Sequence, residues 1–295
     1  MTSDLPNESG AKSEVIDLAN PEAVCQLLPN FPDQIYASTG GLINNETPLI
    51  CGGSRGGGDG ATECFTIGKT EETTGIVTNM LESRLYPSSV VLDDRLWIYG
   101  GRTDTSEFVY VDGRNSEFGP DVPEGIFDEA CMVRISDTEV VIIGGGDNDG
   151  LGSETHIYDI TTNQFTRGPD MLKKRVGHSC SLFEYQGERY VLAVSGYTSK
   201  ESSEYWNPKS DQGWIEGPIL DLGPDEPPCF SKTNLLSSQY GTVLIGCNNA
   251  NGGKIFQLSE DGEGNLSWST MTKTLEYPKH ETVAMFIPDE MATCS

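Results

Sequence analysis

Residues 87–101, Pro-Ser-Ser-Val-Val-Leu-Asp-Asp-Arg-Leu-Trp-Ile-Tyr-Gly-Gly, contain two apolar runs, a polar turn between them and a terminal pair of glycines. Two apolar runs separated only by Asp93 and Asp94 are typical of a β-hairpin. The glycine pair supplies backbone that tolerates positive φ and the close approach of neighbouring chain. The stretch therefore predicts two adjacent antiparallel strands that end in a tight, crowded turn.

The glycine pair recurs along the whole chain. It stands at Gly52-Gly53, Gly100-Gly101 and Gly144-Gly145, and in weaker form at Ser195-Gly196, Gly246-Cys247 and Thr293-Cys294. Successive first positions are 48, 44, 51, 51 and 47 residues apart. A period near 50 residues lies in the range of propeller blades and favours four strands per unit.

After each glycine pair the sequence predicts a polar loop, a third strand and a fourth strand. The third strands, at 108–112, 156–159, 203–207 and 254–258, carry an aromatic residue, in most cases followed by an acid or amide. The fourth strands carry the large aromatic residues Phe165, Trp214 and Trp268. A large aromatic side chain fills the gap between neighbouring wedge-shaped sheets.

This combination of paired glycines, an aromatic–acid pair and a fourth-strand aromatic residue resembles the kelch repeat over nearly the whole chain. The resemblance implies a circular β-propeller with four antiparallel strands in each blade. Five complete units are expected at about 31–80, 81–125, 126–171, 172–220 and 221–275.

The two chain ends complement each other. Residues 281–294 match the first and second strands of a unit, residues 12–18 match a third strand and residues 25–29 match a fourth. We therefore expect an all-β, six-bladed kelch-type β-propeller, a single domain over residues 12–295, whose closing blade is built from both termini. Residues 1–11 are expected to be a disordered tail.

Net charge and the pattern of apolar residues limit the classes of partner and the location that we expect. A net charge of −26 argues against nucleic-acid binding, because phosphates would be repelled over most of the surface. No apolar run approaches the ~20 residues that span a bilayer. The first ten residues lack the basic start and apolar core of a secretory signal, so we expect a cytoplasmic protein, or a secreted one if a segment has been removed. We also expect a monomer.

Eight cysteines bear on the compartment. Cys51 ends a second strand and Cys64 lies in the third strand beside it, so a disulfide between them is a hypothesis that requires an oxidising compartment. Cys131 and Cys180 are interpreted as small buried core residues. A bond between Cys25 and Cys294 is less favoured, because fourth and second strands of a blade are not adjacent.

The candidate binding site is the mouth of the central channel, where loops after the glycine pairs and before the first strands are expected to meet. Its candidate residues are Tyr36, Arg55, Arg84, Arg102, Asn148, Arg175, Tyr197, Asn248 and Lys279. Because the chain has only 19 Lys and Arg, five of them at this rim suggest an acidic peptide or anionic ligand. The alternative is that Arg84 and Arg175 belong to the repeat itself.

Chemical motifs are scarce. The chain has three histidines and neither a nucleophile elbow nor a zinc-binding His-Glu-x-x-His motif, so we predict no catalytic residues, no metal and no cofactor. The leading hypothesis is a non-enzymatic module that binds a protein partner, as the kelch resemblance implies. The alternatives are a sugar epimerase or mutarotase that uses Arg84, His280 and Glu281, or a secreted structural protein, for which a Cys51–Cys64 disulfide would be the sign.

Overall fold

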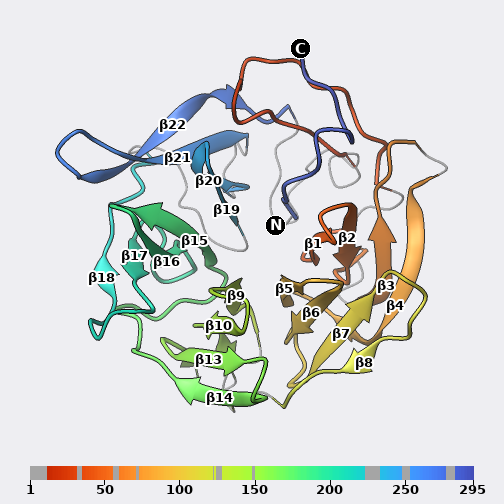
Figure 1. Cartoon of the computed structure of the whole chain (residues 1–295), viewed down its shortest axis with the longest axis horizontal. Coiled ribbons are helices and arrows are strands. Elements are labelled where there is room, and N and C mark those ends of the chain that lie inside the picture. Colours follow the sequence, from red (N-terminus) through yellow and green to blue (C-terminus); the bar gives the residue numbers. More distant parts are fainter. Residues whose placement is uncertain are drawn as a thin grey trace, which may run out of the picture.

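The computed structural model describes residues 12–31, 35–55, 60–70, 73–121, 123, 128–147, 150–222, 233–247, 253–276 and 283–295, and their repeating structure is β-strand. The strands of this part of the chain form five four-stranded antiparallel sheets and one two-stranded ribbon. The sheets are arranged around a common centre, so the fold is that of a β-propeller (Figure 1).

Each sheet uses consecutive stretches of chain. The first contains β1 (Thr39–Ile43), β2 (Thr47–Cys51), β3 (Ala61–Thr66) and β4 (Gly75–Arg84), and the second β5 (Ser88–Leu92), β6 (Arg95–Tyr99), β7 (Ser106–Tyr110) and β8 (Glu117–Phe118). The third contains β9 (Cys131–Arg134), β10 (Glu139–Ile143), β13 (Thr155–Asp159) and β14 (Gln164–Arg167). The ribbon of β11 (Gly146–Asp147) and β12 (Gly150–Leu151) is an insertion in this sheet.

The remaining two sheets complete the series. The fourth contains β15 (Ser179–Tyr185), β16 (Glu188–Val194), β17 (Ser203–Trp206) and β18 (Ile215–Glu216). The fifth contains β19 (Asn234–Ser238), β20 (Gly241–Ile245), β21 (Lys254–Glu260) and β22 (Leu266–Thr274). Four of the sheets lie within the units expected from the 50-residue period, and the first extends past its expected end at residue 80, since β4 ends at Arg84.

The glycine pairs adopt the conformation for which glycine is suited. Gly52 and Gly53 have φ of 68° and 87°, and Ser195 follows the same path at 67°. A Cβ atom on Gly144 would lie 2.6 Å from the carbonyl oxygen of Arg175. The turn after the second strand is therefore crowded by the segment that leads into the next sheet.

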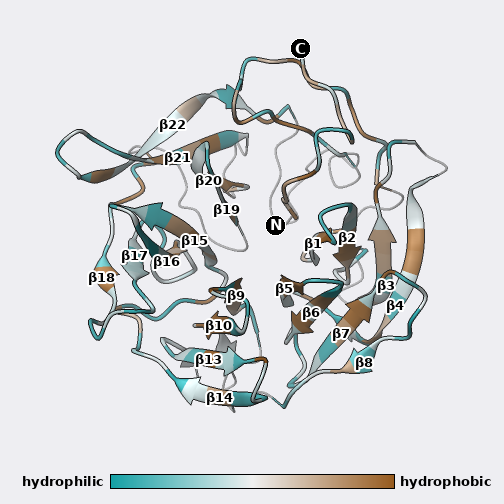
Figure 2. Ribbon diagram, in the orientation of Figure 1, coloured by the Kyte–Doolittle hydropathy of each residue, from teal (hydrophilic) through white to brown (hydrophobic). Residues whose placement is uncertain are grey.

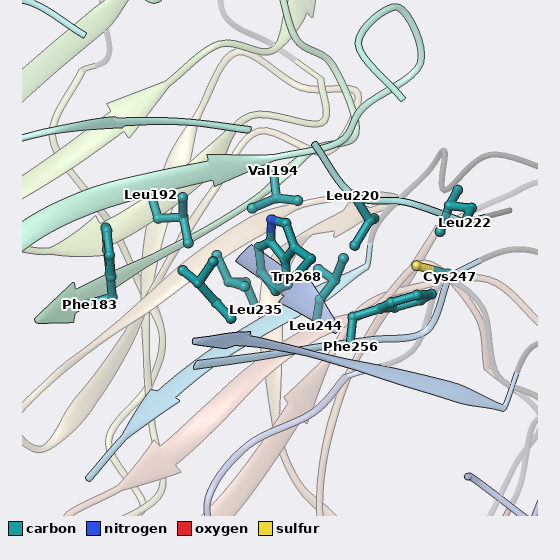
Figure 3. Packing of buried hydrophobic residues seen from close by; sticks show 11 residues of the cluster. Phe183, Leu192, Val194, Leu220, Leu222, Leu235, Leu244, Cys247, Phe256 and Trp268 are labelled. Atoms are coloured by element: carbon teal, nitrogen blue, oxygen red, sulfur yellow. The ribbon is translucent and has the colours of Figure 1, made fainter. Parts of the chain in front are cut away.

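Apolar side chains fill the space between neighbouring sheets. Figure 2 shows the contrast within one sheet, from hydrophobic β9 and β10 to the mostly hydrophilic outer strand β14. Trp268 of β22 packs in one cluster with Val194 of the fourth sheet and Leu235 of the fifth (Figure 3). Trp214 donates from its indole N–H to Pro169 of the preceding unit at 3.1 Å. The fourth-strand aromatic residues thus occupy the inter-sheet gap predicted for them.

The expected sixth four-stranded sheet is not formed by the described residues. Instead, the chain ends lie side by side between the fifth and first sheets (Figure 1), where Cys25 pairs directly with Cys294. Ile16 and Leu18 pack on the fifth sheet, while Phe31 packs on Phe65 of the first. Because residues 12–18 lie against the fifth sheet, no third strand separates the other two segments. Residues 1–11, predicted as a disordered tail, lie outside the described residues.

Three disulfides are fully described, and two of them overturn expectations. Cys51–Cys64 is formed as hypothesised, between residues directly opposite each other on β2 and β3. Cys131–Cys180 is also formed, so the interpretation of these residues as unbonded core was wrong: β9 and β15 are neighbours around the channel. Cys25–Cys294 joins the two ends, because these segments are adjacent after all. Cys247 is disulfide-bonded as well.

The disulfide between the chain ends is expected to contribute more stability than the one inside the first sheet. Its cysteines are 269 residues apart, against 13 for Cys51 and Cys64. Loop-closure entropy predicts losses of about 5 kcal/mol and about 3 kcal/mol, respectively, when each bond is removed. Urea unfolding of Cys25→Ser/Cys294→Ser and of Cys51→Ser/Cys64→Ser measures the difference. An equal loss in both variants would contradict the entropic account.

Candidate functional site at the rim of the ring

The loops that precede the first strands share an unusual backbone conformation. The residue two positions before the strand has a positive φ in four sheets: Ala37 (59°), Tyr86 (60°), Glu129 (52°) and Gly177 (67°). Neighbouring loops are joined here, since Tyr86 N–H donates to Ala37 O at 2.9 Å and Gly177 N–H donates to Glu129 O at 3.0 Å. Only one of the four is glycine, so no recognisable residue pattern marks these joined loops.

Four residues lie on the loops where the first sheet meets the second. The backbones of Tyr36 and Ser54 pair in both directions, so Arg55 follows directly after the residue opposite Tyr36. Arg102 follows the glycine pair of the second sheet, and its guanidinium lies 5.8 Å from the centre of the Tyr86 ring. We call Tyr36, Arg55, Tyr86 and Arg102 the rim cluster. Tyr86 was absent from the residues predicted for the site.

The two arginines of the rim cluster are both exposed. Arg55 forms an ion pair with Glu63 at 3.1 Å. The pKa of Glu63 is lowered, chiefly by a hydrogen bond from its own backbone amide and further by Arg55. Arg102 has a cation–π contact with Tyr86. Arg102 thus offers an anion a guanidinium held by an aromatic ring, and Arg55 offers one that a carboxylate already orients.

Arg84 and Arg175, predicted as rim residues, are fully buried and cannot serve as exposed ligands. Arg84 Nε donates to Glu107 at 2.6 Å, and Arg175 Nε donates to Glu204 at 2.7 Å. Their position in the repeat is as predicted, but the side chains point into the next sheet. The alternative that they belong to the repeat therefore describes them better.

The two buried pairs are built alike. The Nη1 group of Arg84 donates to the carbonyls of Gly100 and Thr105, and that of Arg175 donates to the carbonyls of Ser195 and Ser202. The second oxygen of each glutamate accepts a backbone N–H, from Leu81 of β4 in the first sheet or from Leu172 in the segment between the third and fourth sheets. Burial lowers the pKa of Arg175, an effect that Glu204 opposes. Each pair thus connects two successive sheets.

The other predicted residues are dispersed or lie outside the described part of the chain. Tyr197 is 40% exposed beside the glycine-pair position of the fourth sheet, where its N–H donates to Val176 O. Asn148, Asn248 and Lys279 lie outside the described residues. So do His280 and Glu281, and Arg84 is engaged with Glu107, so the described residues do not assemble the trio required by the epimerase hypothesis.

A small cavity of about 150 Å³ lies between the first strands. Its polar lining comes mainly from hydroxyl and amide side chains, namely Thr39, Ser88, Ser89, Ser179, Thr233 and Asn234. His178 also lines it, and neither ring nitrogen has a hydrogen-bond partner among the described residues. Burial, with a smaller effect from Arg175, lowers the pKa of His178 to about 3. This side chain is therefore a neutral, buried histidine.

Comparisons with known proteins support the fold. No family model and no curated protein matches the chain. Among solved structures, one described as "Structure of YjhT" superposes with a TM-score of 0.69 at 11% identity, over 88% of this chain and 89% of that one. At this identity the likeness shows the propeller-like fold alone.

Two further properties concern the described residues only. None of the described segments is a helix long and apolar enough to cross a membrane. Within the same residues, no three His, Cys, Asp or Glu side chains are grouped as metal ligands would be.

Breaking one buried ion pair should destabilise the protein strongly. In Arg84→Met the carboxylate of Glu107 stays buried without its partner, and we expect unfolding to become easier by about 3–5 kcal/mol in urea. Arg84→Met/Glu107→Leu should lose less than the single variant. Arg189→Met is the control, because its pair with Glu184 is exposed and should contribute less than about 1 kcal/mol. A double variant as unstable as the single one would contradict this account.

His178 should make the protein less stable as the pH falls from 7.5 to 5.5. Its pKa is about 3 when folded, whereas the unfolded side chain takes up a proton near 6.5. The unfolded state therefore binds more protons, and the free energy of unfolding should fall by roughly 1 kcal/mol between pH 7.5 and pH 5.5. Comparing wild type with His178→Leu at both pH values isolates this contribution from that of the carboxylates. An identical pH dependence in the two proteins would refute the assignment.

Proposed function

We propose that this chain is a kelch-type propeller that acts, as a monomer, as a non-enzymatic interaction module and binds an acidic segment of a protein partner at the rim cluster. The observations that carry the proposal are that Arg55 and Arg102 are both exposed on neighbouring loops and that the Arg102 guanidinium lies over the Tyr86 ring. Arginine and tyrosine are the residues on which protein interfaces most often depend.

Charge supports this choice of partner. The protein carries a net charge of −26, so an acidic segment is repelled over most of the surface. Two exposed guanidiniums on neighbouring loops of such an acidic surface define where an anionic group is tolerated. A ligand carboxylate at Arg55 would compete with Glu63, which favours a multivalent acidic segment over a single carboxylate.

The disulfides bear on where the module works. The described cysteines are bonded in pairs within a sheet, between sheets and between the chain ends, and disulfides persist mainly in oxidising compartments. This argues against the cytoplasmic location expected from the first residues of the sequence. We therefore place the module in a secretory or extracellular setting.

The chain ends support a sixth blade position. Val24 and Ser295 exchange backbone hydrogen bonds, and Gln26 N–H donates to Thr293 O at 2.8 Å. We propose that the two ends together occupy the place of the closing blade, although as described they lack its regular strands. Closure of this kind fixes the rim loops relative to one another and so pre-forms the binding surface.

Binding of a labelled hexaglutamate peptide, followed by fluorescence anisotropy, tests the proposal. Arg55→Ala/Arg102→Ala should weaken binding at least tenfold and reduce its dependence on salt, because two contacts between a guanidinium and a peptide carboxylate are lost. Arg114→Ala/Arg189→Ala is the matched control, since both side chains are exposed arginines in ion pairs away from the rim cluster. Tyr86→Ala should also weaken binding. No measurable binding, or an equal loss in the control, would overturn the proposal.

A further inference from the structure

A cavity lies at the chain ends. It has a volume of about 720 Å³, within the range of small-molecule sites. Its walls come from the N-terminal segment, the C-terminal segment and the flanking first and fifth sheets, including Ile16, Phe31, Ile50, Ile245 and Leu275. The cavity exists because two irregular segments, rather than a regular sheet, cover the apolar faces of two blades (Figure 1).

The polar lining of this cavity carries more negative than positive charge. Glu14, Asp17 and Asp289 line it, against a single lysine, Lys12. Glu14 is only half satisfied: one carboxylate oxygen accepts the N–H of Glu276 at 2.7 Å, while the other is buried and has no hydrogen-bond partner among the described residues. A buried carboxylate oxygen without a donor is costly, so a ligand that supplies one is favoured.

We propose that this cavity binds an amphipathic ammonium compound, whose apolar body occupies the space between the sheets and whose N–H groups meet Glu14. The apolar walls select a hydrocarbon or aromatic body, and the acidic lining selects a cation over an anion. Asp17 is less available, because its Oδ1 accepts the N–H groups of Ala19 and Asn20. None of the four rim-cluster residues lines this cavity, although its lining residues Ile35 and Ser38 flank Tyr36, and the site does not depend on the function proposed at the rim.

The test uses N-phenyl-1-naphthylamine, which fluoresces in apolar surroundings, with the oxidised full chain. We expect saturable binding and displacement by dodecylammonium at concentrations at least tenfold lower than by dodecanoate, both below their micellar concentrations. Ile245→Trp, which fills the cavity, should abolish the signal, whereas Ile76→Trp on the exposed face of β4 should not. An absent signal, or one unchanged by Ile245→Trp, would overturn the site.

A second comparison isolates Glu14 from the general attraction of an acidic protein for cations. Glu14→Gln should still bind the dye, but the ratio of its affinity for dodecylammonium to its affinity for dodecanol should fall several-fold. Glu46→Gln removes the same charge at an exposed turn and should leave this affinity ratio unchanged. Displacement by dodecanoate as effective as by the amine, or equal ratios in the two variants, would overturn the assignment of an ammonium ligand.

Discussion

The arrangement of successive sheets depends on two buried arginines. Arg84 is the last residue of the first sheet, and its guanidinium binds Glu107 of the second sheet. Arg175 lies after the third sheet, and its guanidinium binds Glu204 of the fourth. Each also holds the carbonyl of the first residue of a glycine-pair turn, Gly100 or Ser195. The turn must be in its left-handed conformation for that carbonyl to face the arginine, so the repeated turns and the packing of neighbouring sheets are fixed by one interaction. Breaking it leaves a buried charge, which makes the arrangement specific.

The other junctions use different chemistry at the same places. Ile35 stands before the first sheet at the position that corresponds to Arg84, and it is buried against Gly53. Near the channel, the Thr39–Ser89 hydroxyl contact of 2.6 Å joins the first position of one sheet to the second position of the next. Cys131–Cys180 joins the corresponding positions of the third and fourth sheets. A hydrogen bond and a disulfide thus perform the same structural task at equivalent points of the ring.

The sequence predicted the repeating elements better than it predicted the direction of side chains. Alternating apolar runs, turn residues and glycine pairs placed all five sheets, because these signals are local. The burial of Arg84 could not be predicted, since an arginine that ends an outer strand looks like a surface residue until the next sheet is in place. Tyr86 was missed because the left-handed conformation it adopts is usually marked by glycine. The Cys131–Cys180 bond could not be predicted from the pattern within one unit, because its cysteines lie on β9 and β15, neighbouring inner strands of different sheets.

The net charge of −26 gives the disulfides a further role. Self-repulsion of like charges favours expansion of the ring, most of all where the ends are joined by only a few backbone hydrogen bonds. The described disulfides span 13, 49 and 269 residues, so they oppose expansion within a sheet, between sheets and around the whole ring. The bond between the ends acts where the regular sheet is missing and where the cavity weakens packing. The covalent bond between the ends therefore holds them together beside the apolar space that they line.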